Sequence, residues 1–417
     1  MDQPNNYCYK QEKCICCNEV NLEKILDLGE QPLANSYHKS GETLPVYPLG
    51  LNLCRKCFHL QLTHIVNPDL LFKNYLYVSG TSKTLKDYFS WFTEWVEAYD
   101  PSLSSVLDIA CNDGSQLDAF ADRGYDTYGV DPAVNLHAIS SKKHKVICDY
   151  FSAEVIEKNV NEVDRWPGRF DIIIAQNVFA HTKHALQFLE DCSKLMHNDS
   201  LLFIQTSQAE MVQNNEFDTI YHEHISFFNI NSINHLIKRT GALNLVDVIK
   251  TPVHGVSYVF IIGKNDDINN KPTLDNLLAL EKIHGLHSLD TYKTYREIIM
   301  EMVQAFQWRI EEFQQTGYKI VGYGAAAKGN TYLNFTKVKL DIIIDDNPLK
   351  QGLLTPGTDI PIHSIDILNT PEYKDSKILF VPLAWNYYDE IRKRLTNVRN
   401  NPNDRFLKYF PQVRSEK

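Results

Sequence analysis

The sequence predicts an α/β protein of three domains, in which a small zinc-binding domain precedes two Rossmann-like domains. Two Cys-x-x-Cys pairs, Cys14–Cys17 and Cys54–Cys57, stand near the N-terminus. Later segments beginning at Ser105 and Tyr318 each read as a buried strand, a glycine-containing loop and a helix. We place the domains at residues 1–80, 81–248 and 249–417, since a chain of 417 residues is expected to hold two or three domains.

The bulk composition is that of an ordinary globular protein, with 43% hydrophobic and 23% charged residues. A net charge of -10 argues against a nucleic-acid partner, which requires a basic face, but not against a small anionic ligand. No run is long enough to cross a bilayer, and the polar start is unlike a signal peptide. We therefore expect no membrane partner and a cytoplasmic location.

The cysteines predict a metal centre, because six of the nine fall before residue 58. This clustering is typical of thiolate ligands in a reducing compartment and not of a disulfide scaffold. Each Cys-x-x-Cys knuckle aims two sulfurs at one point, so Cys14, Cys17, Cys54 and Cys57 form a tetrahedral Zn²⁺ site. Cys16 competes with Cys17 for the first knuckle, although the spacing of the second pair favours Cys17. Four thiolates fill the coordination shell, which indicates a structural zinc.

The segments around the second knuckle are less informative. Residues 26–37 contain Gly and Pro, which mark a surface loop. Tyr75 and Tyr77 are either core aromatics or the lip of a pocket. From about residue 84 to 99, an apolar period close to 3.6 predicts a helix.

The second domain begins with a nucleotide-binding pattern over residues 105–117. Gly114 permits close approach of a ligand to the backbone, and Asp108 or Asp113 suits hydroxyls or an amine. A second strand ends in Asp131, about 20 residues after the loop, where a carboxylate holds the two hydroxyls of a ribose. The loop lacks the full glycine pattern of NAD-binding proteins, which favours S-adenosylmethionine over NAD.

A third strand starts at Phe170 and brings His181 to the carboxyl edge of the sheet, where doubly wound folds bind ligands. A further strand over residues 201–205 leads to Tyr221-His222-Glu223-His224. This tetrad offers every useful protonation role near neutral pH. An extended backbone would separate Tyr221 from His224, whereas a turn would let both face one ligand. The tetrad moves a proton to or from carbon, binds a metal, or forms a polar network under a loop.

The third domain repeats the Rossmann pattern after a strand at 254–263 and long amphipathic helices between about 273 and 316. Residues 318–330 contain Gly322-x-Gly324-x-x-Ala327, and a helix starting there offers amides, a positive dipole and Lys328 to a diphosphate. The motif alone suits NAD or a structural turn equally. A strand and turn follow at 342–348.

The order of motifs resembles that of the nucleotide-sugar C-methyltransferases. The resemblance rests on both Cys-x-x-Cys pairs, Leu-Asp-Leu-Gly-Glu-Gln-Pro-Leu-Ala-Asn, Asn-Asp-Gly, Asn-Val-x-Ala-His, Tyr-His-Glu-His and Leu-Ala-Trp-Asn. It runs from the zinc segment to the C-terminus. It implies S-adenosylmethionine in the middle domain, a Rossmann-like methyltransferase domain, and a nucleotide-sugar diphosphate, most simply a dTDP-linked 4-keto-6-deoxysugar, held by the C-terminal domain. The reaction it implies is methylation at sugar carbon 3.

The resemblance also implies roles for individual residues. His224 is the base, Glu223 orients or polarises an imidazole, and Tyr221 and His181 donate hydrogen bonds to the developing enolate oxygen. The expected cofactor contacts are Asp108, Ala110, Asn112, Gly114, Asp131, Gln176 and Asn177. The expected nucleotide-sugar contacts are Tyr75, Tyr77, His254, Tyr323, Gly324, Ala325, Lys328, Asn347, Trp385 and Asn386, of which Trp385 either stacks on the ligand or packs.

Three positions depart from the family pattern: Ala110 replaces a glycine, Gln205 a glutamate, and Val256 a second glycine. The last two bear on which sugar fits. The alternatives to a carbon methyltransferase are a sugar O-methyltransferase and a non-catalytic nucleotide-sugar-binding scaffold. We expect a monomer.

Overall fold

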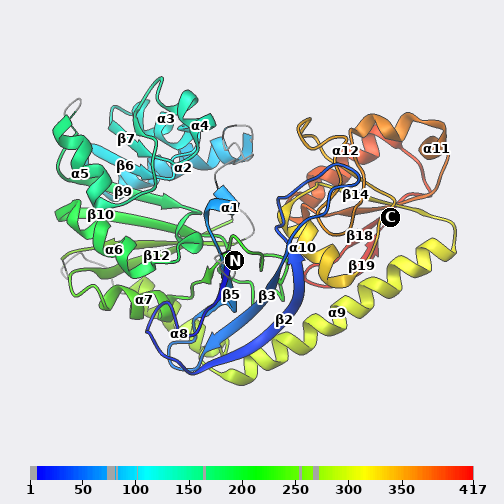
Figure 1. The fold of residues 1–417 in the computed structure, drawn as a ribbon, viewed down its shortest axis with the longest axis horizontal. Helices are drawn as coiled ribbons and strands as arrows, with labels where there is room; N and C mark the ends of the chain where they lie inside the picture. The colour runs from blue at the N-terminus through cyan, green and yellow to red at the C-terminus, as the bar shows by residue number, and fades with distance from the viewer. Residues whose placement is uncertain are drawn as a thin grey trace, which may run out of the picture.

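The computed structural model describes residues 7–72, 80, 83–100, 102–162, 166–252, 256–265 and 272–416. Two α/β lobes are joined by the long helix α9 (Leu289–Gln315), and an N-terminal sheet lies between them (Figure 1). Three of the expected substrate contacts, Tyr75, Tyr77 and His254, lie outside the described residues.

The N-terminal sheet is antiparallel and four-stranded, in the order β11-β4-β3-β2. Its strands are β2 (Leu22–Pro32), β3 (Val46–Cys54), β4 (Leu60–Leu62) and β11 (Ser226–Phe227). A separate pair joins β1 (Cys8–Lys10) to β5 (His64–Val66), and the short helix α1 (Asp69–Phe72) follows. Because β11 comes from far along the chain, this sheet is completed by the domain that follows it.

The expectation of a surface loop over residues 26–37 is wrong for residues 26–32. Residues up to Pro32 belong to β2, in which Leu26 and Leu28 are buried. Gly29 has φ +74° and sits at a break in the β2–β3 register, which explains a glycine within a strand. Leu33 and Ala34 are buried, Asn35 is exposed, and Ser36 and Tyr37 are partly exposed, so only residues 33–37 form a loop.

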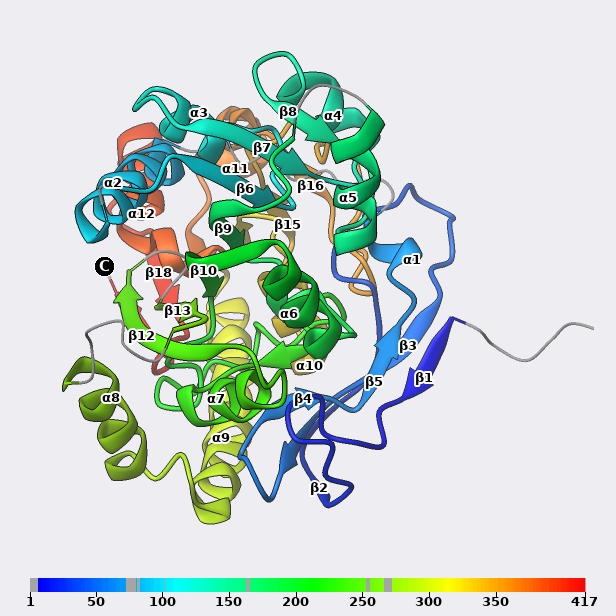
Figure 2. The same cartoon turned by 90° about the vertical axis from the view of Figure 1, so that its left-hand side faces the viewer.

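The central sheet has seven strands in the order β12-β13-β10-β9-β6-β7-β8 (Figure 2). The strands β10, β9, β6, β7 and β8 run parallel, whereas β13 and β12 are antiparallel additions at one edge. The strand bounds are β6 (Ser105–Ile109), β7 (Asp126–Val130), β8 (Lys145–Ile147), β9 (Phe170–Gln176), β10 (Met196–Thr206), β12 (Asn244–Thr251) and β13 (Ser257–Gly263).

The helices of this lobe are α2 (Lys83–Tyr99), α3 (Ser115–Ala121), α4 (Val134–Ser140), α5 (Ala153–Glu162), α6 (Ala185–Lys194), α7 (Ile230–Lys238) and α8 (Pro272–Ile283), with a 3-10 turn η2 (Phe179–His181). Helix α2 buries Leu85, Tyr88, Phe92 and Val96, spaced three or four residues apart, as the sequence period predicts. The strand-loop-helix pattern at β6 and α3 is confirmed. The strand β13, which we assigned to the third domain, pairs instead with β10 and β12, because its all-buried residues complete the central sheet.

The C-terminal sheet has six strands in the order β16-β15-β14-β17-β18-β19, of which only the β18–β19 pair is antiparallel. Its strands are β14 (Lys319–Tyr323), β15 (Ile342–Ile344), β16 (Ile362–His363), β17 (Ile378–Pro382), β18 (Arg405–Lys408) and β19 (Arg414–Glu416). The accompanying helices are α10 (Ala327–Thr336), α11 (Pro371–Lys374) and α12 (Tyr388–Arg399), with 3-10 turns η3 (Ile365–Asn369) and η4 (Trp385–Tyr387).

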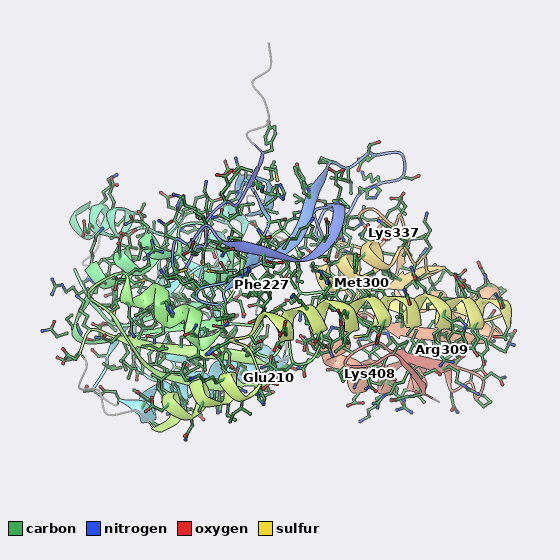
Figure 3. All side chains as sticks on the ribbon, turned by 90° about the horizontal axis from the view of Figure 1, so that it is seen from below. Glu210, Phe227, Met300, Arg309, Lys337 and Lys408 are labelled. Carbon is green, nitrogen blue, oxygen red and sulfur yellow. The ribbon has the colours of Figure 1, made fainter. Side chains whose placement is uncertain are left out.

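One hydrophobic core runs from the N-terminal sheet through α9 into the C-terminal sheet. Phe217, from the loop between β10 and β11, enters this core and stacks on Tyr332 of α10 with ring centroids 4.9 Å apart. Figure 3, seen from below, shows α9, labelled at Met300 and Arg309, running from the inner edge of the central-sheet lobe along the C-terminal lobe. The loop that carries the tetrad is therefore fixed from the C-terminal side. None of the described helices is long and apolar enough to span a bilayer.

Candidate active site

The four predicted zinc ligands converge. The Sγ atoms of Cys14, Cys17, Cys54 and Cys57 all lie within 4.8 Å of one another. The Cys14–Cys57 sulfurs are 3.6 Å apart and the Cys17–Cys54 sulfurs 3.4 Å. A tetrahedral zinc with bonds of about 2.3 Å separates its sulfurs by about 3.8 Å, so the thiols fit this ion. Cys17, not Cys16, completes the first knuckle.

A cavity of about 500 Å³ opens at the carboxyl edge of the central sheet. Its walls include all seven expected cofactor contacts except Gly114, together with His181, Gln205 and aromatic side chains. Three buried polar atoms on these walls, Gln176 Nε2, Asn177 Oδ1 and Gln205 Nε2, have no hydrogen-bond partner within the described chain. Buried polar groups of this kind need a partner, so the cavity is built for a polar ligand. Gln205, which we associated with the sugar, lies on this cavity.

Asp131 is held rigidly at the end of β7. Its Oδ2 accepts a hydrogen bond from the Asn112 amide at 2.9 Å, and its Oδ1 accepts one from the Ala133 amide at 2.8 Å. This carboxylate position is the one that binds ribose hydroxyls in doubly wound folds. Gly114 has φ +84°, and a Cβ there would lie 3.0 Å from the His144 ring, so glycine is required at the start of α3.

Ala110, where the resemblance led us to expect a glycine, has a left-handed backbone with φ +61°. This conformation costs alanine roughly 1–2 kcal/mol. We expect Ala110→Gly to stabilise the protein by about 0.5–1 kcal/mol, after the larger chain entropy of unfolded glycine is subtracted. Urea unfolding checks this. Ala119→Gly, within helix α3, is the control and should destabilise by about 1 kcal/mol; equal losses in both variants would contradict the account.

Asp108 is the most unusual group on the cavity wall. It is buried, and burial together with the carboxylates of Asp131 and Asp113 raises its pKa well above the ordinary value of 3.8. A cluster of three carboxylates favours a cationic ligand. S-adenosylmethionine carries a sulfonium and an ammonium, which fit this requirement. The cavity therefore matches the predicted cofactor in size, in polar groups and in charge.

The affinity for S-adenosylmethionine should consequently rise with pH. A cation binds the ionised carboxylate of Asp108 and lowers its pKa, so binding releases a proton until the pH exceeds the pKa of the free protein. Each unit of that lowering adds about 1.4 kcal/mol, or tenfold, to the affinity at high pH. Calorimetry across pH, in buffers of different ionisation enthalpy, measures the affinity and the number of protons released on binding. Asp108→Asn should reduce the pH dependence to the part that Asp131 contributes, because burial raises the pKa of that carboxyl as well. Asp126→Asn, which changes an exposed carboxylate on β7, should preserve the wild-type dependence; a pH-independent wild type would contradict the assignment.

The tetrad forms a turn, the second of the two geometries considered. The His224 amide donates to the Tyr221 carbonyl at 2.9 Å, and the Tyr221 hydroxyl lies 2.9 Å from His224 Nε2. His224 Nδ1 lies 2.8 Å from the Thr219 carbonyl, which accepts only from an N–H. Thr219 Oγ1 and Gln208 Nε2 lie farther from Nδ1, at 3.2 Å and 3.3 Å, so the shorter contact with the carbonyl favours the ring proton on Nδ1. In that tautomer Nε2 keeps a lone pair that accepts from Tyr221.

His181 connects His224 to the cofactor cavity. It lies on the cavity wall, and its ring centroid is 5.1 Å from that of His224. Burial lowers the pKa of His181 to about 4, so its imidazole is neutral at pH 7 and remains a hydrogen-bond donor. His224 itself is buried, with 6% of its surface exposed. His181 thus lies on the cavity wall, and His224 lies behind it.

We expected Glu223 to orient or polarise an imidazole, but the carbonyl of Thr219 makes the 2.8 Å contact with the His224 ring. Glu223 Oε1 instead accepts a hydrogen bond from Asn35 Nδ2 at 2.6 Å, and burial raises the pKa of Glu223 to about 7. His222 Nε2 lies 3.3 Å from the Tyr47 carbonyl of β3, and burial lowers its pKa to about 4. His222 is therefore a packing residue, whereas Glu223 ties the tetrad to the N-terminal loop.

The glycine motif of the C-terminal domain is explained by packing. A Cβ on Gly322 would lie 2.8 Å from Ile343, and one on Gly329 would lie 2.7 Å from Leu383. Gly324 has φ +90° and abuts Ala384. The Ala325 amide, expected to be free for a diphosphate, donates to Asp345 Oδ2 at 2.7 Å. The Ala325 amide is therefore already hydrogen-bonded within the protein and is not available to a diphosphate.

Other expected substrate contacts also have internal partners. The Tyr323 hydroxyl donates to Asp346 at 2.9 Å, and Asn347 Oδ1 accepts from the Leu349 amide at 3.0 Å. The Ala325 carbonyl accepts from the Tyr37 hydroxyl and from Lys350 Nζ. Asn386 lies in the turn η4, directly after Trp385. Tyr37 and Lys350 were not among the predicted site residues.

Lys328, Trp385 and Asp218 form a polar cluster between the tetrad loop and the C-terminal domain. The Trp385 Nε1–H donates to Asp218 Oδ2 at 2.7 Å, and Lys328 Nζ lies 5.1 Å from the indole centroid. Both Lys328 Nζ and Asp218 Oδ1 are buried without a hydrogen-bond partner in the described part of the chain. Burial raises the pKa of Asp218 to about 6, although Lys328 opposes this. Asp218 was missed, although it lies in the segment around the tetrad.

The fold and the cavity define a methyltransferase dependent on S-adenosylmethionine. Three family models match the chain in order: a "Putative zinc binding domain" at 14–72, a "Methyltransferase domain" at 82–246, and a "C-methyltransferase C-terminal domain" at 252–411. When bound, S-adenosylmethionine supplies an electrophilic methyl group.

The chain is an S-adenosylmethionine-dependent C-methyltransferase with an N-terminal zinc-binding domain, as these three matches in order and the four converging cysteines indicate. It is 29% identical to the C-methyltransferase NovU of Streptomyces niveus, over 97% of this chain and 96% of that protein. A ubiquinone biosynthesis O-methyltransferase of Rhodopseudomonas palustris is 33% identical over 24% of this chain and 39% of its own length. Magnesium protoporphyrin IX methyltransferase from Synechocystis PCC 6803, solved with bound S-adenosylmethionine, aligns with TM-score 0.32 and 13% identity over 43% of this chain and 79% of that one.

Proposed function

We propose that this C-methyltransferase acts at carbon 3 of a nucleotide-linked 4-keto-6-deoxysugar, with thymidine diphosphate as the nucleotide part. The observation that carries the proposal is the state of His224. With Nδ1 protonated toward the Thr219 carbonyl, its shortest contact, Nε2 is a lone-pair acceptor on a ring whose centroid is 5.1 Å from that of the cavity-lining His181. A buried proton acceptor beside a methyl-donor site suits methylation of carbon, which must first lose a proton.

The chemistry requires an acidic C–H. A carbon beside a ketone becomes nucleophilic when its proton is removed and the electron pair is shared with the carbonyl oxygen as an enolate. In our proposal the proton passes to His224 Nε2, whose present hydrogen-bond donor is the Tyr221 hydroxyl. That hydroxyl, displaced from Nε2 by the substrate, becomes a donor to the enolate oxygen.

His181 supports the same enolate. Because burial holds its pKa near 4, it stays neutral and donates a hydrogen bond without releasing a full proton at pH 7. Its place on the cavity wall supports the proposal that it donates to a substrate bound next to the methyl donor. Residues His181, Tyr221 and His224 are thus the proposed catalytic group.

The nucleotide diphosphate is assigned to the Lys328 cluster. A buried ammonium without a hydrogen-bond partner is suited to an anion, and Trp385 beside it offers an aromatic face to a base or a sugar. The unpartnered Asp218 Oδ1 is suited to a hydroxyl or an N–H of the same ligand. One member of the cluster, Asp218, lies on the loop that carries the tetrad, three residues before Tyr221.

The test is product analysis with a panel of dTDP- and UDP-linked 4-keto-6-deoxysugars and [¹³C-methyl]-S-adenosylmethionine. We expect a ¹³C methyl resonance coupled to a quaternary or branched ring carbon at position 3 for one dTDP sugar. A methoxy resonance would identify a sugar O-methyltransferase instead. Methylation of only non-nucleotide ketones would overturn the substrate assignment while leaving the proton chemistry intact.

A further inference from the structure

We infer that the zinc centre positions the two catalytic histidines, and that Ser226 and His59 are the side chains that transmit this positioning. The inference rests on the proposed function in taking His181 and His224 as the proton-handling groups. It extends the zinc's role from holding its own domain together to setting the geometry of a site formed by residues far along the chain.

The path begins at the backbone of Ile225, the residue after His224. Its amide donates to the Ala180 carbonyl at 2.8 Å, and its carbonyl accepts from the Leu62 amide at 2.9 Å. Ala180 directly precedes His181. One residue therefore ties both histidines to the end of β4, and the strand β11 that follows continues this pairing with Ser226 opposite Gln61.

Strand β4 is in turn built on both zinc knuckles. The second knuckle leads directly into it, and the Cys54 amide donates to the His59 carbonyl at 2.9 Å. The first knuckle bonds to the Gln61 side chain, whose Oε1 accepts from the Ile15 amide at 2.9 Å and whose Nε2 donates to the Lys13 carbonyl at 3.0 Å. Gln61 is fully buried, so these bonds fix the strand relative to the metal site.

The side chain of His59 provides a second, parallel connection. It is fully buried, and its Nε2 lies 3.3 Å from Ser226 Oγ. Its ring centroid is 4.9 Å from that of Phe228, which stacks on Phe179 at 4.9 Å. Phe179 opens the turn η2 that ends at His181. The zinc domain is thus connected to His224 through Ser226. It is connected to His181 through Phe179.

Side chains of helix α7 and of its two capping residues donate hydrogen bonds to the knuckles. Asn231 Nδ2 donates to the Cys57 carbonyl at 2.9 Å, Asn229 Nδ2 to the Phe58 carbonyl at 2.8 Å, and Arg239 Nη1 to the Cys16 carbonyl at 2.7 Å. The cavity for S-adenosylmethionine is less dependent on this region, since Pro68 is its one wall residue from the first 80 within the described chain. Loss of positioning should therefore spare cofactor binding.

The experiment compares Ser226→Ala with Ser200→Ala in the full-length zinc-loaded protein. Both serines are fully buried, but the Ser200 hydroxyl bonds within the central sheet, where it accepts from the His197 amide at 2.8 Å and donates to the Phe170 carbonyl at 2.7 Å. We expect both variants to keep one zinc per chain and an S-adenosylmethionine Kd within about threefold of wild type. Ser226→Ala should lower kcat by about 10–100-fold with little change in KM, as a misplaced base does, whereas Ser200→Ala should keep kcat.

A ¹⁵N-histidine NMR spectrum supplies a readout that is independent of turnover, with His224 assigned through the His224→Ala variant. The wild type should show His224 protonated on Nδ1 alone, and Ser226→Ala should show a mixture of tautomers. Equal kcat and an unchanged His224 resonance in Ser226→Ala would overturn the inference. If His224→Ala retains full activity while Ser226→Ala still disturbs the resonance, the positioning stands and the proposed function fails.

Discussion

Replacement of His224 by alanine should lower kcat for methyl transfer by about 10²–10⁴-fold, because a required base is lost. The Kd for S-adenosylmethionine should stay within about threefold of wild type, since His224 is not on the cofactor cavity wall and contacts it through His181. Single-turnover kinetics with saturating cofactor measures the effect on chemistry, and calorimetry measures the effect on binding.

His222→Ala is the matched control. His222 is an equally buried neighbour, but its ring is held by the Tyr47 carbonyl and has no place in the proposed line of proton transfer. We expect this variant to lose stability and to keep kcat within about threefold. A His224→Ala enzyme with near-full turnover, or a His222→Ala enzyme with the larger loss, would assign the base to another residue.

Replacement of Cys57 by serine should release zinc and unfold the N-terminal sheet. Structural zinc sites bind with roughly 10–16 kcal/mol, and that free energy is also folding free energy. Both knuckles bond to β4 and to α7, so the loss should propagate to β11 and lower methyl transfer by at least 100-fold. Zinc analysis, circular dichroism and turnover on the same sample measure the three effects together.

Cys148→Ser provides the control, since Cys148 is an exposed thiol outside the zinc set. It should retain zinc, melting temperature and activity. Retention of zinc by Cys57→Ser would show that the four-thiolate site is wrong. Loss of zinc with an unchanged melting temperature and unchanged activity would show that the metal is neither structural nor positioning.

The sequence predicted those features that depend on local patterns. The knuckle spacing identified Cys14, Cys17, Cys54 and Cys57, because ligand geometry is encoded within four residues. The alternation of buried strand, loop and helix located Asp108 and Asp131 at the carboxyl edge of the central sheet, because parallel strands align these ends. The turn geometry of Tyr221 and His224 was one of two alternatives, and a single hydrogen bond decided between them.

Features that depend on contacts between distant segments were not predictable. Residues 26–32 contain turn-forming Gly and Pro, yet form a strand because Leu26 and Leu28 face the core shared with α9. The partner of Glu223 is Asn35, on a segment that reads as surface. The glycines near 324 resemble a phosphate loop, but side-chain packing against residues 383 and 384 already requires them. A two-residue strand such as β11 leaves no periodic signal at all.

Solvent deuterium exchange at the ring carbon beside the ketone, with S-adenosylmethionine omitted, tests the central claim most directly. If His224 Nε2 removes that proton, the wild-type enzyme incorporates one deuterium at carbon 3 of the keto-sugar, visible as a one-mass-unit gain and loss of the proton signal. The His224→Ala enzyme then leaves the substrate unlabelled. Labelling at an equal rate in both enzymes, or no labelling by a wild-type enzyme that methylates the same carbon at full speed, would contradict the account.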